Sequence, residues 1–167
     1  GVVNPKSVDL TAEIADGMLI SALAGPEYVH TVSERIKSQR AGGEEDFRFV
    51  TYALISVSPK RDEARSKVRP LAALYLNAMG PTLLTGAYGV NDALIELINQ
   101  GGSTALEQKM PDEWLDWLAV AGEPEECLAG IQNLFTAGSS SVVLCVVPSE
   151  ELPEQLDIIS REILPEL

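Results

Sequence analysis

The residues with the clearest potential for binding chemistry form one short run near the start of the chain, Val2-Val3-Asn4-Pro5-Lys6. This run predicts a helix that begins at Pro5, because proline suits the first helical position, where no backbone N–H is needed. Free N–H groups at a helix start bind anions, and the ammonium group of Lys6 would add positive charge there. The run therefore indicates an anion site, with a plain helix start and a solvated lysine as the alternative.

The usual catalytic signatures are absent from the chain, which contains no GxGxxG, GxxxxGK[ST], HExxH or GxSxG motif. A catalytic triad or a Cys-His pair would have to depend on His30, the single histidine. His30 lies beside Val29 in a predicted helix and off its apolar stripe, whereas site residues of α/β folds lie at the carboxyl ends of strands. We therefore expect a solvated or capping His30, and the catalytic residue stays unknown.

The remaining polar and aromatic candidates favour structural roles. Three acidic runs fall in loops or first helical turns, where solvent and the helix dipole stabilise carboxylates, and they predict no metal site: Glu44-Glu45-Asp46, Glu125-Glu126 and Glu150-Glu151. Trp114 and Trp117 share one helical stripe, which favours core packing over stacking on a ligand ring. Cys127 and Cys145 lie in separate apolar contexts without a CxxC pair, so we expect reduced, packed thiols.

The elements that must position these residues follow a repeating pattern. Three apolar runs predict buried strands at 17–22, 47–57 and 141–147, and two are continuous enough to suit a sheet covered on both faces. Helices are predicted after Pro26 and Pro124, and a C-terminal helix carries Leu152, Leu156, Ile159 and Ile163. Twice a helix stops near a glycine and turns directly into an apolar strand. This arrangement predicts a parallel α/β fold.

Residues 60–121 are predicted to be helical without a strand, with Pro70 kinking or restarting the first helix and Gly101-Gly102 closing another. They form a helical insertion on the α/β frame. No low-complexity tract or long linker divides the chain, so a single domain over 1–167 is predicted.

Composition limits the classes of partner. The chain has 167 residues, 46% of them hydrophobic, which suffices for one globular core. Its net charge of −13 would repel nucleic acid and anionic membranes, so neither is expected as a partner. We expect a soluble, cytoplasmic protein, since no signal core or membrane-length apolar stretch is seen. The first residue is Gly rather than Met, so the chain is processed, carries a cloning scar, or is a piece of something longer.

Four segments carry a resemblance to a known family: NPKSVDLTAEIADGMLIS, LISVSPKRDEARSKV, WLAVAGEPEECLAGIQNLFTAG and the terminal EILPEL. Together they resemble the luciferase-like monooxygenase superfamily, and more narrowly its deazaflavin-dependent branch of methylenetetrahydromethanopterin reductase type. The resemblance implies the C-terminal part of a (β/α)8 TIM barrel, from just after the fifth strand to the end. An open sheet of this kind would pair with a second copy, associate with an N-terminal half, or reorganise its strands.

The resemblance also implies a function, hydride transfer between coenzyme F420, or FMN in the flavin branch, and a bound substrate. A pterin such as methylenetetrahydromethanopterin is implied by the nearest branch. The loop Val3, Asn4, Pro5, Lys6 would contact the ribityl-phosphate region of the coenzyme, although family members usually carry Gly where Asn4 stands. The catalytic groups would lie in the N-terminal half. The alternatives are an FMN-dependent monooxygenase portion and a non-catalytic half-barrel that binds a cofactor or a partner.

Overall fold

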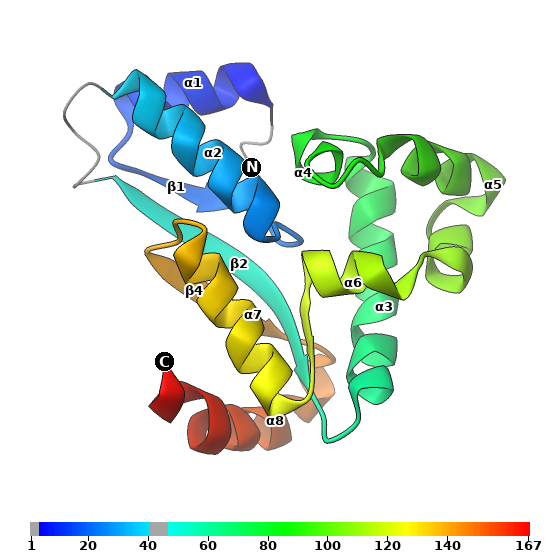
Figure 1. The fold of residues 1–167 in the computed structure, drawn as a ribbon. Helices are drawn as coiled ribbons and strands as arrows, with labels where there is room; N and C mark the ends of the chain where they lie inside the picture. The colour runs from blue at the N-terminus through cyan, green and yellow to red at the C-terminus, as the bar shows by residue number, and fades with distance from the viewer. Residues whose placement is uncertain (1–3, 41–46) are drawn as a thin grey trace.

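The fold is known from a computed structural model that describes residues 4–40 and 47–167. This part of the chain contains one sheet of four strands: β1 (Gly17–Ile20), β2 (Arg48–Val57), β3 (Val120–Gly122) and β4 (Ser141–Val146). Eight α-helices surround it: α1 (Pro5–Ile14), α2 (Pro26–Gln39), α3 (Arg61–Met79), α4 (Leu83–Gly86), α5 (Asn91–Lys109), α6 (Asp112–Leu118), α7 (Pro124–Thr136) and α8 (Leu152–Ile158). None of these helices is long and apolar enough to cross a bilayer. Figure 1 shows the arrangement.

Strand β2 is the centre of the sheet, and every pairing to it is parallel. Thr51 pairs with both β1 and β4, so these strands flank β2 on opposite edges. Ile55 pairs with both β3 and β4, which places β3 on the same edge as β1, further along the strand. The long central strand therefore carries two short strands in succession on one edge and a single strand on the other.

The predicted parallel α/β class and the three predicted strands are confirmed, with small changes of boundary. The prediction that 60–121 contains no strand is wrong, because Val120–Gly122 forms β3. Three residues are too few to show a period, so the sequence pattern could not separate them from the preceding helix. Pro70 does not restart the first helix, since α3 runs through it as one helix, whereas α5 does depart from helical backbone angles at Gly101 and Gly102.

Helices α1, α2 and α7 begin with proline at the first helical turn and bury one stripe each. The residues Val29, Val32 and Ile36 of α2 are buried, as their spacing predicts. From α7, Cys127, Ile131 and Leu134 are buried in the same core. Helix α7 ends before Gly138, which has a φ of 121° and turns the chain into β4.

A row of ion pairs aligns two helices of the insertion and ties the first of them to α7. Arg65 and Arg69 of α3, one turn apart, pair with Asp116 and Asp112 of α6. Arg61, one turn earlier, reaches Glu126 of α7 with a nitrogen to oxygen distance of 3.1 Å. Spacing of four residues places such side chains on one helical face, so α6 is aligned along α3.

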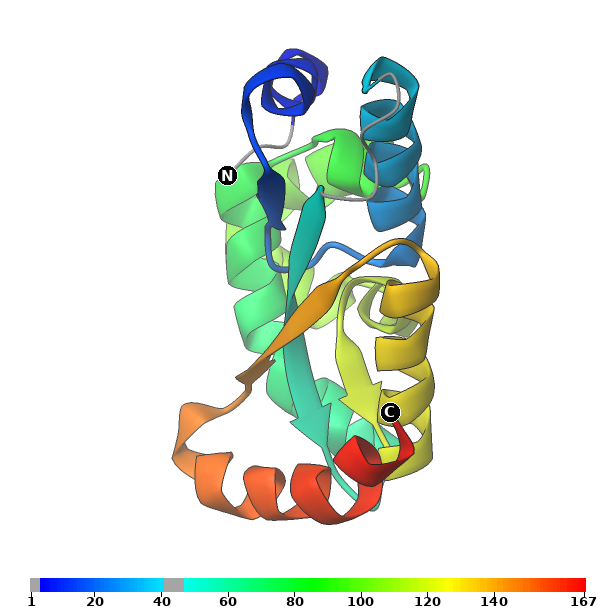
Figure 2. The ribbon, with the colours of Figure 1, turned by 90° about the vertical axis from the view of Figure 1, so that its left-hand side faces the viewer.

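The carboxyl ends of β2 and β4 are joined by the side chain of Gln155 from α8. Its Oε1 accepts a hydrogen bond from the Val57 amide at 2.9 Å, and its Nε2 donates one to the Val147 carbonyl at 3.0 Å. The side-chain amide thus continues the ladder where β4 has ended. Gln155 is only 1% exposed. Helix α8 consequently lies across this end of the sheet (Figure 2).

We predict that Gln155→Leu lowers the free energy of unfolding by about 2–4 kcal/mol, because it leaves the buried Val57 N–H and Val147 carbonyl without partners. Urea denaturation followed by circular dichroism measures the change. The matched control is Gln132→Leu, whose amide forms one exposed contact to Glu166 and whose loss should change stability by no more than about 0.5 kcal/mol. Equal effects of the two substitutions would contradict the role assigned to Gln155.

Candidate functional site

The predicted anion site divides between described and undescribed residues. Val3 lies outside the described residues, while Asn4, Pro5 and Lys6 begin α1. The Asn4 side chain accepts a hydrogen bond from the Ser7 amide at 2.8 Å and caps the helix itself. Because Pro5 has no N–H, the Lys6 amide and its exposed ammonium group remain for an anion. This donor set fits a phosphate, although it is smaller than an uncapped helix start would offer.

Asn4 itself has extended backbone angles, with φ −106° and ψ 153°. No left-handed conformation is required here, so a glycine at this position would serve close approach rather than backbone freedom. The departure from the family pattern at Asn4 therefore acts through its side chain, which occupies a helix amide that a phosphate could otherwise use.

The loop after β1 is packed tightly against the insertion. Leu23 is fully buried and has a φ of 68°, a left-handed conformation that is uncommon for residues with a side chain. Gly25, the N-cap of α2, leaves no room for a Cβ atom, which would collide with the Trp117 carbonyl and the Tyr88 hydroxyl. That hydroxyl accepts a hydrogen bond from the Glu27 amide at 3.2 Å. The insertion thus caps α2 and fixes this loop.

The carboxyl ends of β2 and β4 meet beneath α8. Ser56 lies there fully buried, and its Oγ has no hydrogen-bond partner among the described residues. Ser58 donates its backbone N–H to the Gly122 carbonyl at 3.1 Å, which joins this end to β3. Pro148 and Ser149 follow β4 directly, at the same edge of the sheet. The structure therefore brings together the predicted ends of β2 and β4.

The end of β1 lies apart from those two ends. Its last residue, Ile20, pairs with Thr51, whereas β4 ends beside Ile55. Four residues of β2 separate these positions, about 13 Å at 3.3 Å per residue. Helix α1 runs antiparallel to β1, so it begins at the end towards which β1 points (Figure 1). Asn4, Pro5 and Lys6 therefore belong with the β1 end and not with the end that α8 covers.

One face of the sheet carries apolar side chains without full cover. The pairing register and the alternation of a strand place Leu19, Val50, Tyr52, Val143 and Cys145 on this face, which we call the inner face. Leu19 is 55% exposed and Val143 is 38% exposed. On the opposite face Met18, Ile20, Phe49 and Ala53 are buried. Exposed apolar side chains of this kind make the inner face a candidate interaction surface.

The two thiols differ in their surroundings. Burial raises the pKa of Cys127 to about 12, and its Sγ lies 3.6 Å from the Gly122 carbonyl oxygen. This thiol is protonated and inert at neutral pH. Partial burial also raises the pKa of Cys145, which lies half-buried on the inner face. Both cysteines are free, as the sequence predicts.

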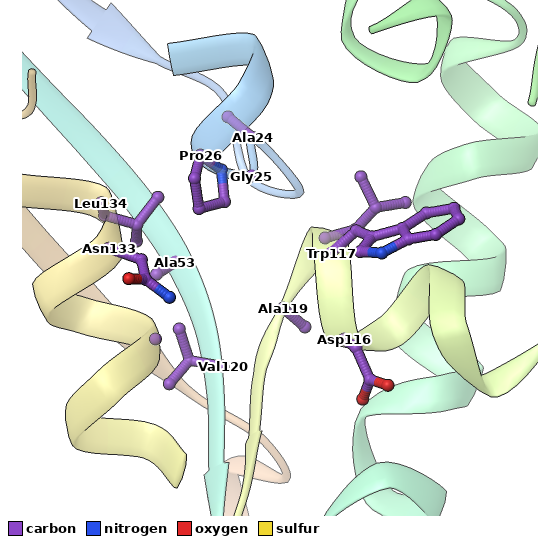
Figure 3. A pocket seen from close by; sticks show the side chains of 12 residues that line it. Ala24, Gly25, Pro26, Ala53, Asp116, Trp117, Ala119, Val120, Asn133 and Leu134 are labelled. Atoms are coloured by element: carbon purple, nitrogen blue, oxygen red, sulfur yellow. The ribbon is translucent and has the colours of Figure 1, made fainter. Parts of the chain in front are cut away.

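A groove opens on the other side of β2, between α6, α7 and the start of α2. Figure 3 shows Trp117 and Asp116 on one wall and Asn133 and Leu134 on the other, with Ala53 on the floor. The groove widens into a cavity of about 570 Å³. His30 is exposed in its wall and not in the core, as expected. No cluster of metal-ligating side chains occurs in the described ranges.

Trp114 and Trp117 lie on the same helix, α6, but differ in burial. Trp114 is buried at 4% exposure, as predicted. Trp117 is half-buried and stacks on Tyr88, with ring centroids 5.2 Å apart and an angle of 7° between the planes. The sequence pattern did not reveal this stack, nor the role of Gln155, because both depend on contacts between distant segments.

A sheet of parallel strands that helices cover on its outer face and leave open on its inner face defines the class of protein as part of a β/α barrel. The family model for luciferase-like monooxygenases matches residues 1–141. The chain belongs to the luciferase-like monooxygenase family. The resemblance inferred from the sequence is thereby confirmed, as is the fold class.

Individual relatives place the chain within one half of such proteins. The 5,10-methylenetetrahydromethanopterin reductase of Archaeoglobus fulgidus is 29% identical over 177 aligned positions, which cover 100% of this chain and 53% of the relative. The coenzyme F420-dependent tetrahydromethanopterin reductase of Methanopyrus kandleri superposes with a TM-score of 0.76 at 20% identity, over 99% of this chain and 49% of that one. The chain thus spans about half the length of these relatives.

A third protein with the same fold carries a different cofactor. It is the oxygenating constituent of 3,6-diketocamphane monooxygenase, a type II Baeyer-Villiger monooxygenase from Pseudomonas putida, solved in complex with FMN. Its TM-score is 0.52 at 17% identity, over 99% of this chain and 47% of that chain. The shared fold therefore occurs in both F420-dependent and FMN-dependent proteins.

We predict that Gly25→Ala displaces the insertion from the start of α2, because the added Cβ meets the Trp117 carbonyl and the Tyr88 hydroxyl. The expected loss of unfolding free energy is about 1–3 kcal/mol, and the tryptophan emission should shift to the red. Gly130→Ala serves as the control, since its Cβ would make only ordinary contact with Val120 at 3.4 Å. Unchanged stability and emission of Gly25→Ala would refute the packing assigned to this loop.

Proposed function

We propose that the chain is the C-terminal portion of an oxidoreductase that transfers a hydride between coenzyme F420 and a small substrate. The observation that carries this proposal is the alignment of the whole chain with about half of a methylenetetrahydromethanopterin reductase. The fold match to an F420-dependent reductase supports it. On the same basis, methylenetetrahydromethanopterin is the substrate that we favour for the assembled enzyme.

A bound deazaflavin or flavin would supply the hydride chemistry, while the protein contributes binding, orientation and a dry pocket. The start of α1 offers the Lys6 amide and ammonium group to a phosphate. On the inner face, Leu19 and Val143 offer apolar surface that would exclude water once covered. We assign no residue of this chain to contact with the reacting atoms, and expect the N-terminal half to supply them.

Two alternatives follow from other observations. The fold match to an FMN-containing monooxygenase component supports a flavin in place of the deazaflavin. The closed end of β2 and β4, where Gln155 of α8 bridges the strands, supports a half-barrel that binds a cofactor or a partner without turnover by itself. Titration with F420 and with FMN shows which cofactor the chain binds, and an assay of turnover shows whether the bound cofactor reacts.

The uncovered inner face also argues for a protein partner. Within the described part of the chain, β1 and β4 pair with β2 alone, so each leaves one edge unpaired. Unpaired strand edges beside apolar surface can form hydrogen bonds with further strands. An N-terminal half of the barrel would supply strands to both edges and complete the ring of eight. A second copy of this chain would cover the same face in the absence of that half.

We expect the chain alone to associate into at least a dimer, because the exposed side chains of Leu19 and Val143 lie beside unpaired strand edges. Sedimentation velocity between about 1 and 100 µM tests this, with a rising sedimentation coefficient as the expected result. A stable monomer throughout that range would rule out association of copies through this face.

Thiol labelling locates the contact. Cys145 should react with a thiol reagent in the dilute protein and become protected as concentration rises, while Cys127, with its pKa raised to about 12, stays unreactive until the chain unfolds. Dimers in which Cys145 keeps its full reactivity would place the contact on another surface.

For the chain without an N-terminal half, we predict weak binding of F420 and FMN and little or no turnover. Absorbance titration measures the binding. Asn4→Gly frees the Ser7 amide and should tighten FMN binding by about ten- to a hundredfold, as expected for one hydrogen bond to a charged group. Riboflavin, which lacks the phosphate, should show no such gain. An equal gain for riboflavin would argue against a phosphate at α1, and tight binding with turnover would contradict the need for a second half.

A further inference from the structure

The groove on the outer side of the sheet has the dimensions of a small-molecule site. Its widest part encloses about 570 Å³, within the range of roughly 300–1,000 Å³ that holds small ligands. Two neighbouring hollows of about 50 and 280 Å³ share Asp116 and Asn133 with it, so the three form one furrow along α7. The furrow therefore has one wide part and two smaller parts beside it.

Small residues create this furrow. Gly25, Ala53, Ala119 and Gly130 line its inner end, where larger side chains would fill the space between α2 and α7. The floor residue Ala53 points to the opposite side of β2 from Tyr52, which lies on the inner face. The furrow is thus separated from the surface on which the proposed oxidoreductase function depends, and the two can be tested independently.

The walls combine stacked rings with negative charge. Trp117 and Tyr88 line the cavity, their rings stacked at 5.2 Å. Glu27 lines it too, and its exposed carboxylate forms no ion pair with a described residue. The other acid, Asp116, is already held by Arg61 and Arg65, with a distance of 3.6 Å to Arg61. Of the two carboxylates that line the cavity, the one of Glu27 is therefore the one that can pair with a bound cation.

We propose that this furrow binds a primary ammonium attached to a flat apolar group. The ring surface of Trp117 and Tyr88 suits the apolar part and attracts a nearby cation. The Glu27 carboxylate suits the ammonium, and the Asn133 amide offers a carbonyl acceptor. The net charge of −13 favours the approach of a cation over an anion.

The test compares phenethylamine with 2-phenylethanol, which share a ring and differ in the ammonium group. Backbone amide and indole shifts in two-dimensional NMR report binding to the whole chain. The amine should shift the signals of Glu27, His30 and Trp117 and bind at least about tenfold more tightly than the alcohol. Equal binding of the two compounds, or shifts confined to inner-face residues such as Tyr52 and Val143, would overturn the proposal.

A pair of charge-neutralising variants tests the role of Glu27. Glu27→Gln should weaken binding of phenethylamine by about two- to fivefold and leave binding of 2-phenylethanol unchanged. Glu13→Gln removes the same charge from the exposed face of α1, outside the furrow, and should change neither. Equal losses in both variants would mean that only the overall charge of the protein attracts the amine, which would overturn the assigned site.

Discussion

The constraint on which the rest of the structure depends is the hydrogen-bonding demand of β2. This ten-residue strand lies at the centre of the sheet, and each of its buried backbone groups needs a partner. Two short strands in succession meet that demand on one edge and β4 on the other, and where β4 ends, Gln155 takes over. The positions of α8 and of the insertion follow from this arrangement, because each is tied to an element that completes the ladder.

Ion pairs and close packing play different parts in positioning the helices of the insertion. The arginines of α3 hold the acids of α6 at a partly exposed surface, where each pair contributes little and the row mainly fixes alignment. The tight contact lies at Gly25, with the Tyr88 hydroxyl on the amide end of α2. Burial raises the pKa of Tyr88 to about 12, so this hydroxyl keeps its proton and its geometry at physiological pH.

The sequence could predict the elements that have a local periodic pattern, but not the features that depend on contacts between distant segments. Buried helix stripes and apolar runs of six or more residues have a period, and they yielded α2, α7, β2 and β4 with nearly correct limits. Strand β3 has three residues and no period, and the Gln155 bridge joins residues 98 positions apart. Of the candidate site, the helix start at Pro5 was predicted, whereas the N-cap hydrogen bond from the Ser7 amide to Asn4 was missed, although Asn directly before a helix-starting proline is a usual N-cap signal.

The two faces of the sheet differ in a way that composition alone does not explain. On the outer face the helices bury every second side chain of β2, such as Phe49 and Ala53, and leave a furrow only where small residues meet. On the inner face the same alternation presents Val50 and Tyr52 with incomplete cover. A sheet that evolved to be wet on one face would carry polar residues there. Apolar residues on the uncovered face instead support the proposal that a second half or a second copy of the chain covers this surface.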